Sequence, residues 1–156
     1  EEDKYADIRQ LRYLLESECM RLALQKATDE EKERLGAALR YYNDMSIELY
    51  KDIEDEERLE HMVDADFLFH YQIIQMSHNS LYRDIYQMVQ VLIRGHIKQL
   101  LSRRVRARME AGLPPMVNET HEKIYRAIME SNAQVIQQLC EEMLAIVPVP
   151  GMDVFE

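Results

Sequence analysis

The chain has 156 residues, a length typical of a single domain with one sizeable core. Hydrophobic residues make up 47%, which excludes a disordered chain, and four glycines and four prolines are too few for a turn-rich β-sandwich. The net charge of −10 at pH 7 argues against a free-standing nucleic-acid binder, because such proteins neutralise phosphate groups with a basic face.

The cysteine content and the hydropathy pattern indicate where the protein works. Cys19 and Cys140 form no CxxC pair, so we interpret them as small core residues in a reducing compartment. The sequence has no signal-peptide pattern and no apolar run of about 18 residues or more. We therefore expect a cytoplasmic protein that does not span a membrane.

Helix-forming residues dominate, and the first two predicted elements are helices. One covers about residues 3–26 and has an inner face at helical spacing: Ile8, Leu11, Leu15, Cys19 and Leu22. Thr28 and Glu31 match a capping box, which predicts the start of the second helix. The buried face of that helix carries Leu35, Leu39, Tyr42, Leu49 and Ile53.

The middle of the chain predicts two more helices. One runs from about residue 58 to residue 77 and is apolar over so wide an arc that we expect it at the centre of the fold. After an interruption at 78–80, a long helix is predicted over 81–110. Its inward side chains are Leu81, Ile85, Met88, Val89 and Leu92.

The last third predicts two shorter helices after a loop at Gly112, Pro114 and Pro115. Asn118 and Asn132 are the expected N-caps of these helices. The tail over 148–156 contains two prolines and a glycine and is expected to be loose. Together the elements predict an all-α fold, an antiparallel bundle of six or seven helices.

Asp66 and His70 stand one helical turn apart, between the apolar faces of the third predicted helix. A carboxylate on an inward arc is costly unless it is paired or binds a metal. An Asp and a His at this spacing are able to hold one divalent ion. A mutual hydrogen bond in the core explains the same spacing, so both interpretations stay open.

Three other polar residues lie on inner faces. His121 shares a face with Ile124, and His96 lies on the predicted inner face of the long helix. Each is either a metal or effector ligand or an ordinary hydrogen-bonded core histidine. Arg12 requires an anion, which is either Glu16 one turn on or the carboxylate of a ligand held bidentately.

Enzyme motifs are missing from the sequence. We find no GxGxxG, Walker, HExxH or GxSxG pattern. No Glu-x-x-His occurs, which argues against a di-iron carboxylate bundle. The expected protein is therefore not an enzyme. A metal-dependent enzyme that uses Asp66, His70 and His121 remains an alternative, as does a purely structural dimerisation module.

Several short motifs recur in a characteristic order. They are Arg12-x-x-x-Glu16, Ala27-Thr28 followed by acidic residues, Asp66-Phe-Leu-Phe-His70, Ser77-His-Asn79-Ser-Leu81 and His121-Glu-Lys-Ile-Tyr-Arg-Ala-Ile128. Their order and spacing resemble the FCD domain, the C-terminal effector-binding domain of FadR-type regulators in the GntR family. The resemblance extends from about Asp3 to Val147. It implies a helical domain that dimerises and binds a small organic acid.

Many members of that family hold a divalent metal with one Asp and three His. The resemblance carries this role to Asp66, His70 and His121, with zinc, nickel or manganese as the expected ion. The fourth histidine is expected 22 residues after His121, where this sequence has Met143, a poor ligand for such ions. Three alternatives follow for this site. The three protein ligands hold the metal together with water or the effector, His96 supplies a fourth ligand, or the metal is lost.

The resemblance also sets the expected partners and the domain boundaries. Arg12 matches the family's first-helix arginine, which faces the effector carboxylate, and we assign His96 to the effector as well. We expect an FCD-like homodimer domain over 1–147 and a tail over 148–156. Family members carry a winged helix-turn-helix before this domain, and no basic recognition helix precedes Asp3. We therefore expect DNA binding only through such an N-terminal domain, which this sequence lacks.

Overall fold

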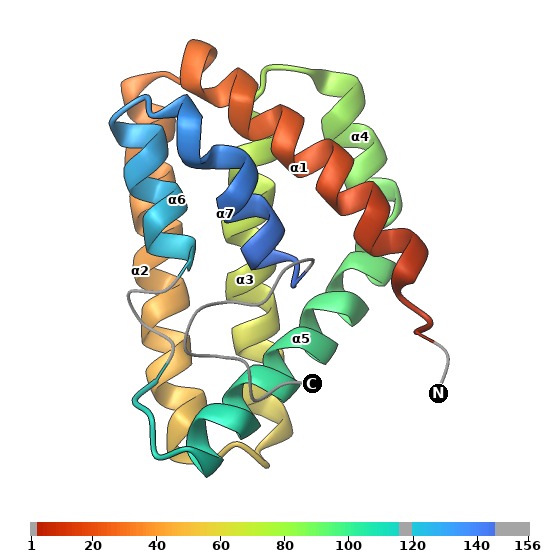
Figure 1. Ribbon diagram of the computed structural model, residues 1–156, viewed down its shortest axis with the longest axis vertical. Helices are drawn as coiled ribbons and strands as arrows, with labels where there is room; N and C mark the ends of the chain where they lie inside the picture. Colours follow the sequence, from red (N-terminus) through yellow and green to blue (C-terminus); the bar gives the residue numbers. More distant parts are fainter. Residues whose placement is uncertain (1–2, 116–119, 146–156) are drawn as a thin grey trace.

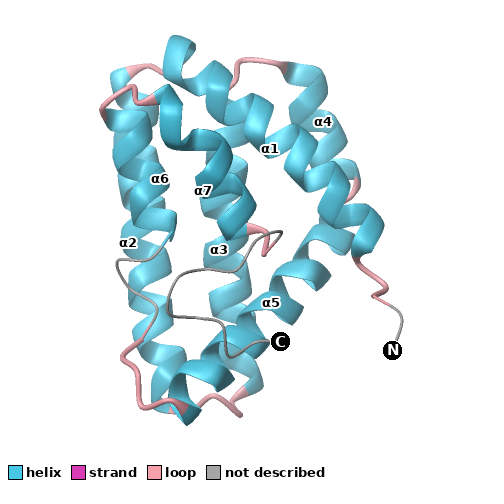
Figure 2. Cartoon of the chain, viewed as in Figure 1, coloured by secondary structure: helices cyan, strands magenta, loops and turns pink. Residues whose placement is uncertain are grey.

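The computed structural model describes residues 3–115 and 120–145, and in these ranges every regular element is a helix (Figures 1 and 2). This confirms the predicted all-α bundle. The elements are α1 (Ala6–Lys26), α2 (Asp29–Lys51), α3 (Glu56–Met76), α4 (Ser80–Met88), α5 (Gln90–Glu110), α6 (Thr120–Met129), the short 3-10 helix η1 (Ala133–Val135) and α7 (Ile136–Met143).

Side-chain caps start several of these helices, as the sequence predicts. The Thr28 hydroxyl accepts a hydrogen bond from the Glu31 backbone N–H, and the Glu31 carboxylate accepts one from the Thr28 N–H. This reciprocal pair satisfies two backbone donors that a helix start leaves free. Asn132 caps η1 in a similar way. Asn118 and the tail over 148–156 lie outside the described residues.

Helix α3 lies at the centre of the molecule, as its wide apolar arc predicts. It packs against α1, α2, α4 and α5 (Figure 1). Its buried side chains include Phe69, Ile73 and Met76, and they also include the polar Asp66 and His70. Asp66 and His70 are therefore withdrawn from solvent inside the bundle.

The prediction of one long helix over 81–110 is wrong in two respects. The chain forms two helices there, α4 and α5, with a break at Val89, whose φ of −102° and ψ of 14° are not helical. The predicted inner face is also exposed, with Leu81 at 63%, Met88 at 83% and Leu92 at 53%. Tyr86 occupies the core instead. Helical spacing of apolar residues identifies a face, but it does not say what covers that face.

Helix α1 also differs in the face that it buries. Leu11 and Leu22, placed on its inner face by the sequence, are partly exposed, whereas Arg12 is buried as expected and Glu16 is buried with it. Cys19 and Cys140 are buried and free, and burial raises the pKa of the Cys19 thiol to about 11, which makes it a core residue rather than a reactive one. No helix among the described residues is long and apolar enough to cross a lipid bilayer.

Candidate metal centre

Three buried side chains from two helices meet inside the bundle. Asp66 and His70 project from adjacent turns of α3, and His121 projects from the first turn of α6. The Oδ1 atom of Asp66 lies 2.9 Å from His70 Nε2 and 3.0 Å from His121 Nε2. One ligand atom of each residue lies within 4.8 Å of the other two. The structure therefore brings together the three ligands that the family resemblance implies.

Aromatic packing fixes the orientation of the His121 ring. The ring stacks on Tyr42, with centroids 3.9 Å apart and an angle of 20° between the planes, and Phe69 packs on it at 5.0 Å. The His70 ring meets it edge-on at 5.4 Å. Because rotation of the imidazole would disturb these contacts, its Nε2 atom stays directed toward Asp66. Tyr42 was expected on a buried face, but its stacking on His121 joins distant segments and was not evident from the sequence.

Helix α1 supplies the partner of the other histidine nitrogen. His70 Nδ1 donates a hydrogen bond to the Glu16 carboxylate. Arg12 Nε in turn donates to Glu16 Oε2 at 2.7 Å, and the Tyr86 hydroxyl donates to the same oxygen at 3.4 Å. A carboxylate that accepts from one ring nitrogen directs the other nitrogen toward a metal and makes it a stronger ligand. Glu16 therefore positions His70.

Charges in this region are strongly coupled. Burial opposes ionisation of Asp66, but the neighbouring His121 and His70 outweigh it and lower the pKa of that carboxyl. Burial acts in the same way on Glu16, and Arg12 and His70 outweigh it, lowering its pKa to about 2. Both carboxylates are thus ionised at neutral pH, which is the state that a metal requires.

The two histidines shift in opposite directions. Burial lowers the pKa of His121 more than Asp66 raises it. Burial also opposes the charge on His70, but Glu16 and Asp66 outweigh it and raise the pKa of that ring. A proton between His70 Nε2 and Asp66 therefore competes with any cation for the same two atoms.

The donor set fits a divalent cation. One carboxylate and two imidazoles, each oriented by a neighbour, suit zinc, nickel or manganese and leave coordination positions for other ligands. Met143 is buried in α7, and its thioether adds no donor that these ions prefer. The same contacts also satisfy Asp66, His70 and His121 without an ion.

Arg12 and His96 lie next to this group. Arg12 Nη1 is 3.0 Å from His96 Nδ1, and both side chains are buried. Of the two partners that the sequence left open for Arg12, Glu16 is in contact. His96 does not belong to the group of three possible metal ligands, so the structure offers no support for it as the fourth.

An all-α bundle that encloses these three ligands beside a buried Arg–Glu pair defines a helical domain with an internal polar site. The model of the FCD domain family matches residues 7–145, so the chain belongs to that family. FCD domains are the effector-binding domains of GntR-type transcription regulators. A comparison with curated proteins found no match.

Proposed function

We propose that this chain is the sensing and dimerising half of a transcription regulator, and that it binds a small carboxylate-bearing metabolite through a divalent metal. The observation that carries the proposal is the convergence of Asp66, His70 and His121 on one point, with Glu16 holding His70 in place. A metal held by three protein ligands keeps open positions, and a carboxylate oxygen of the effector is a suitable ligand for one of them.

Regulation requires that the effector bind one conformation of the dimer more tightly than another. The site lies between α1, α3 and α6, so a ligand there contacts three helices whose packing it is able to bias. We propose that DNA affinity resides in an N-terminal winged helix-turn-helix, and that such a regulator works in the cytoplasm.

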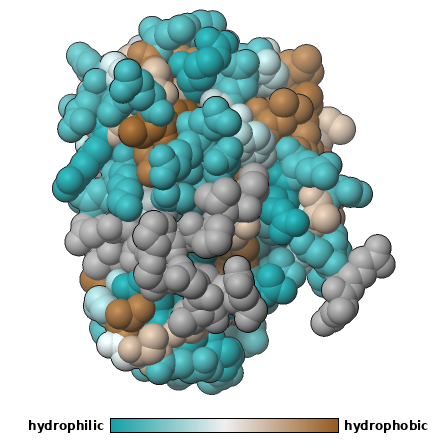
Figure 3. Space-filling model, viewed as in Figure 1, coloured by the Kyte–Doolittle hydropathy of each residue, from teal (hydrophilic) through white to brown (hydrophobic). Residues whose placement is uncertain are grey.

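The homodimer part of the proposal rests on an uncovered apolar face. Leu81, Met88, Val91 and Leu92 are exposed on α4 and at the start of α5, and Figure 3 shows hydrophobic side chains gathered over α4. An interface that buries about 800 Å² per partner typically has an apolar centre, and an exposed group of large apolar side chains is suited to form one. We propose that a second copy of the chain covers this face. Light scattering tests this proposal, because the Met88→Glu variant is expected to lose the dimer.

Elemental analysis of protein never exposed to chelator tests the metal. We expect about one equivalent of a divalent metal in the wild type, because three ligands are already in place. The His121→Ala variant removes one ligand and is expected to lose the metal. His61→Ala, which changes an exposed histidine outside the site, is the control and is expected to keep it.

The hydrogen bonds among the three side chains favour one second candidate, a structural module without metal. In that case wild type and His121→Ala both lack metal, and chelators leave thermal stability unchanged. Effector-dependent DNA binding by a full-length regulator tests sensing itself. A DNA affinity that stays constant at saturating carboxylate would contradict the proposed function even if metal is bound.

A further inference from the structure

His96 on α5 has two ring nitrogens with very different surroundings. Its side chain is fully buried, and its Nδ1 atom lies 3.0 Å from Arg12 Nη1. An arginine is always charged and has only donors, so Nδ1 must accept this hydrogen bond. Burial, followed by the nearby charge of Arg12, lowers the pKa of His96 to about 3. The neutral ring therefore carries its one proton on Nε2.

That proton has no acceptor among the described residues. His96 Nε2 is buried and makes no hydrogen bond, in contrast to the paired nitrogens that His70 and His121 direct at Asp66. A buried donor without a partner is unfavourable, and most such groups in proteins are satisfied by water or by a ligand. The unpaired Nε2–H thus marks a position where a bound molecule places an acceptor atom.

We infer that His96 Nε2–H is a binding residue that donates a hydrogen bond to a carboxylate oxygen of the bound effector. This inference rests on the proposed function, and it assigns the effector a second point of recognition away from the metal ligands. Arg12 can only donate a hydrogen bond, so Nδ1 of His96 must accept it. The protein therefore fixes the proton of His96 on Nε2 before the ligand binds.

The surroundings of His96 favour an anionic acceptor. The charge of Arg12 acts on its ring more strongly than the opposite charge of Glu16, with which Arg12 is paired, and the resulting positive field stabilises an anion. Arg12 also bonds Glu16, which bonds His70. One continuous buried chain of contacts therefore joins the Nδ1 side of His96 to the candidate metal centre.

Tyr5 is a partly exposed side chain beside His96. Tyr5 immediately precedes α1, is only partly buried, and its ring centroid lies 6.0 Å from that of His96. Its hydroxyl covers Gly95, where an added Cβ atom would come within 2.6 Å of the Tyr5 oxygen. The absence of a side chain at Gly95 lets Tyr5 lie over this part of α5. Movement of one partly exposed ring would open the path to His96.

Two substitutions test the roles of the two ring nitrogens of His96 separately. In His96→Asn the amide oxygen takes the place of Nδ1 and still accepts from Arg12, but no donor remains at the position of Nε2. In His96→Gln the amide nitrogen takes the place of Nε2 and keeps that donor. We measure binding of acetate to the metal-loaded protein by calorimetry, with acetamide as a neutral probe of the same shape.

We expect His96→Asn to weaken acetate binding about tenfold or more, which is the effect of losing one hydrogen bond to a charged group. His96→Gln should stay within about threefold of the wild type, and acetamide should bind far more weakly than acetate. Both variants should retain the metal in elemental analysis, because neither change touches Asp66, His70 or His121.

Equal acetate affinity in the wild type and His96→Asn would overturn this inference and leave the metal-dependent function standing. Loss of the metal from the wild type would instead contradict the proposed function. Nitrogen-15 NMR of the wild-type histidines gives a test that needs no variant. It should show a neutral His96 with its proton on Nε2 whose signal shifts saturably with acetate. A proton on Nδ1 would overturn the inference. A signal that acetate leaves unchanged would also overturn it, because it would mean that a buried water and not the ligand accepts from Nε2.

Discussion

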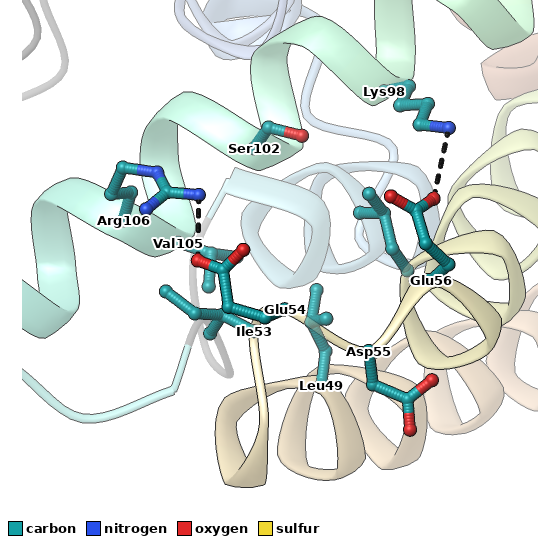
Figure 4. Close-up of a pocket in the computed structure, with 10 residues that line it drawn as sticks. Leu49, Ile53, Glu54, Asp55, Glu56, Lys98, Ser102, Val105 and Arg106 are labelled. Carbon is teal, nitrogen blue, oxygen red and sulfur yellow. Dashed lines mark ion pairs between the residues drawn. The ribbon is translucent and has the colours of Figure 1, made fainter.

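Two regions of this domain use the same kinds of charged residue in opposite ways. In the interior, Arg12 and Glu16 are each only 1% exposed and are in direct contact. At the junction of the α2–α3 loop with α5, Arg106 pairs with Glu54 at 3.1 Å and Lys98 pairs with Glu60 at 2.8 Å, and all four side chains are largely exposed. Figure 4 shows this second region, where Arg106 pairs with Glu54 and Lys98 also reaches Glu56, beside the apolar side chains of Leu49, Ile53 and Val105.

The second region encloses a cavity of about 220 Å³ above Leu49, Ile53, Leu59 and Val105. Its charged groups keep their hydration, so each pair contributes little. The buried pair has lost its water, and either partner alone would be an uncompensated charge in the core. Exposure, more than distance, therefore decides what an ion pair contributes to the stability of this fold.

Removing one partner of the buried pair is the strongest test of this comparison. We expect Arg12→Leu to lower the free energy of unfolding by about 3–5 kcal/mol, because Glu16 is left as a buried charge without its main cation. The double variant Arg12→Leu/Glu16→Gln should recover part of the loss, since it removes that charge. Urea unfolding at pH 7 measures both. A single-variant loss below about 1 kcal/mol would contradict the difference between the regions.

A smaller effect is expected when only the charge of Glu16 is removed and metal binding is measured. Glu16→Gln keeps the shape but weakens the acceptor of the His70 Nδ1 proton, and loss of such an orienting partner lowers metal affinity about 10- to 100-fold. Zinc competition with a chromophoric chelator gives the affinity. Glu18→Gln, on the exposed side of the same helix, is the matched control and should be unchanged. Equal affinities in the two variants would show that Glu16 does not position His70.

The sequence alone predicted the parts of this domain that depend on local rules. Apolar spacing identified α3 as the central helix, and the Thr28-x-x-Glu31 pattern located the start of α2. The i, i+4 spacing and the family resemblance together identified Asp66, His70 and His121, which the structure brings to one point.

Other features depend on contacts between distant segments, and the sequence did not reveal them. Leu81, Met88 and Leu92 have the spacing of a core face, but they are exposed, and Tyr86 is the side chain of α4 that enters the core. The sequence offered Glu16 as a partner for Arg12, yet its contact with His70 joins residues 54 positions apart. The proton of His96 lies on Nε2 because α1 brings Arg12 to its Nδ1, and Nε2 has no partner among the described residues.

The capping box at the start of α2 tests an intermediate case, because its hydrogen bonds are partly exposed but lie within one turn. Thr28→Ala removes the hydroxyl that accepts from the Glu31 N–H, and we expect a loss of about 1 kcal/mol in the free energy of unfolding. Thr28→Ser keeps the acceptor and should stay close to the wild type. Urea unfolding compares the two, and an equal loss in both would mean that the hydroxyl is not what stabilises the helix start.

The exposed pairs around the α5 cavity should give the smallest effect. Arg106→Ala and Lys98→Ala are each expected to change the free energy of unfolding by no more than about 0.5 kcal/mol, because water replaces the lost partner of Glu54 or Glu60. Raising the salt concentration should reduce even this difference, since exposed charges are screened. Urea unfolding at low and high salt makes the measurement. A loss comparable to that of Arg12→Leu would mean that these pairs are desolvated when the protein folds, and exposure would no longer separate the two regions.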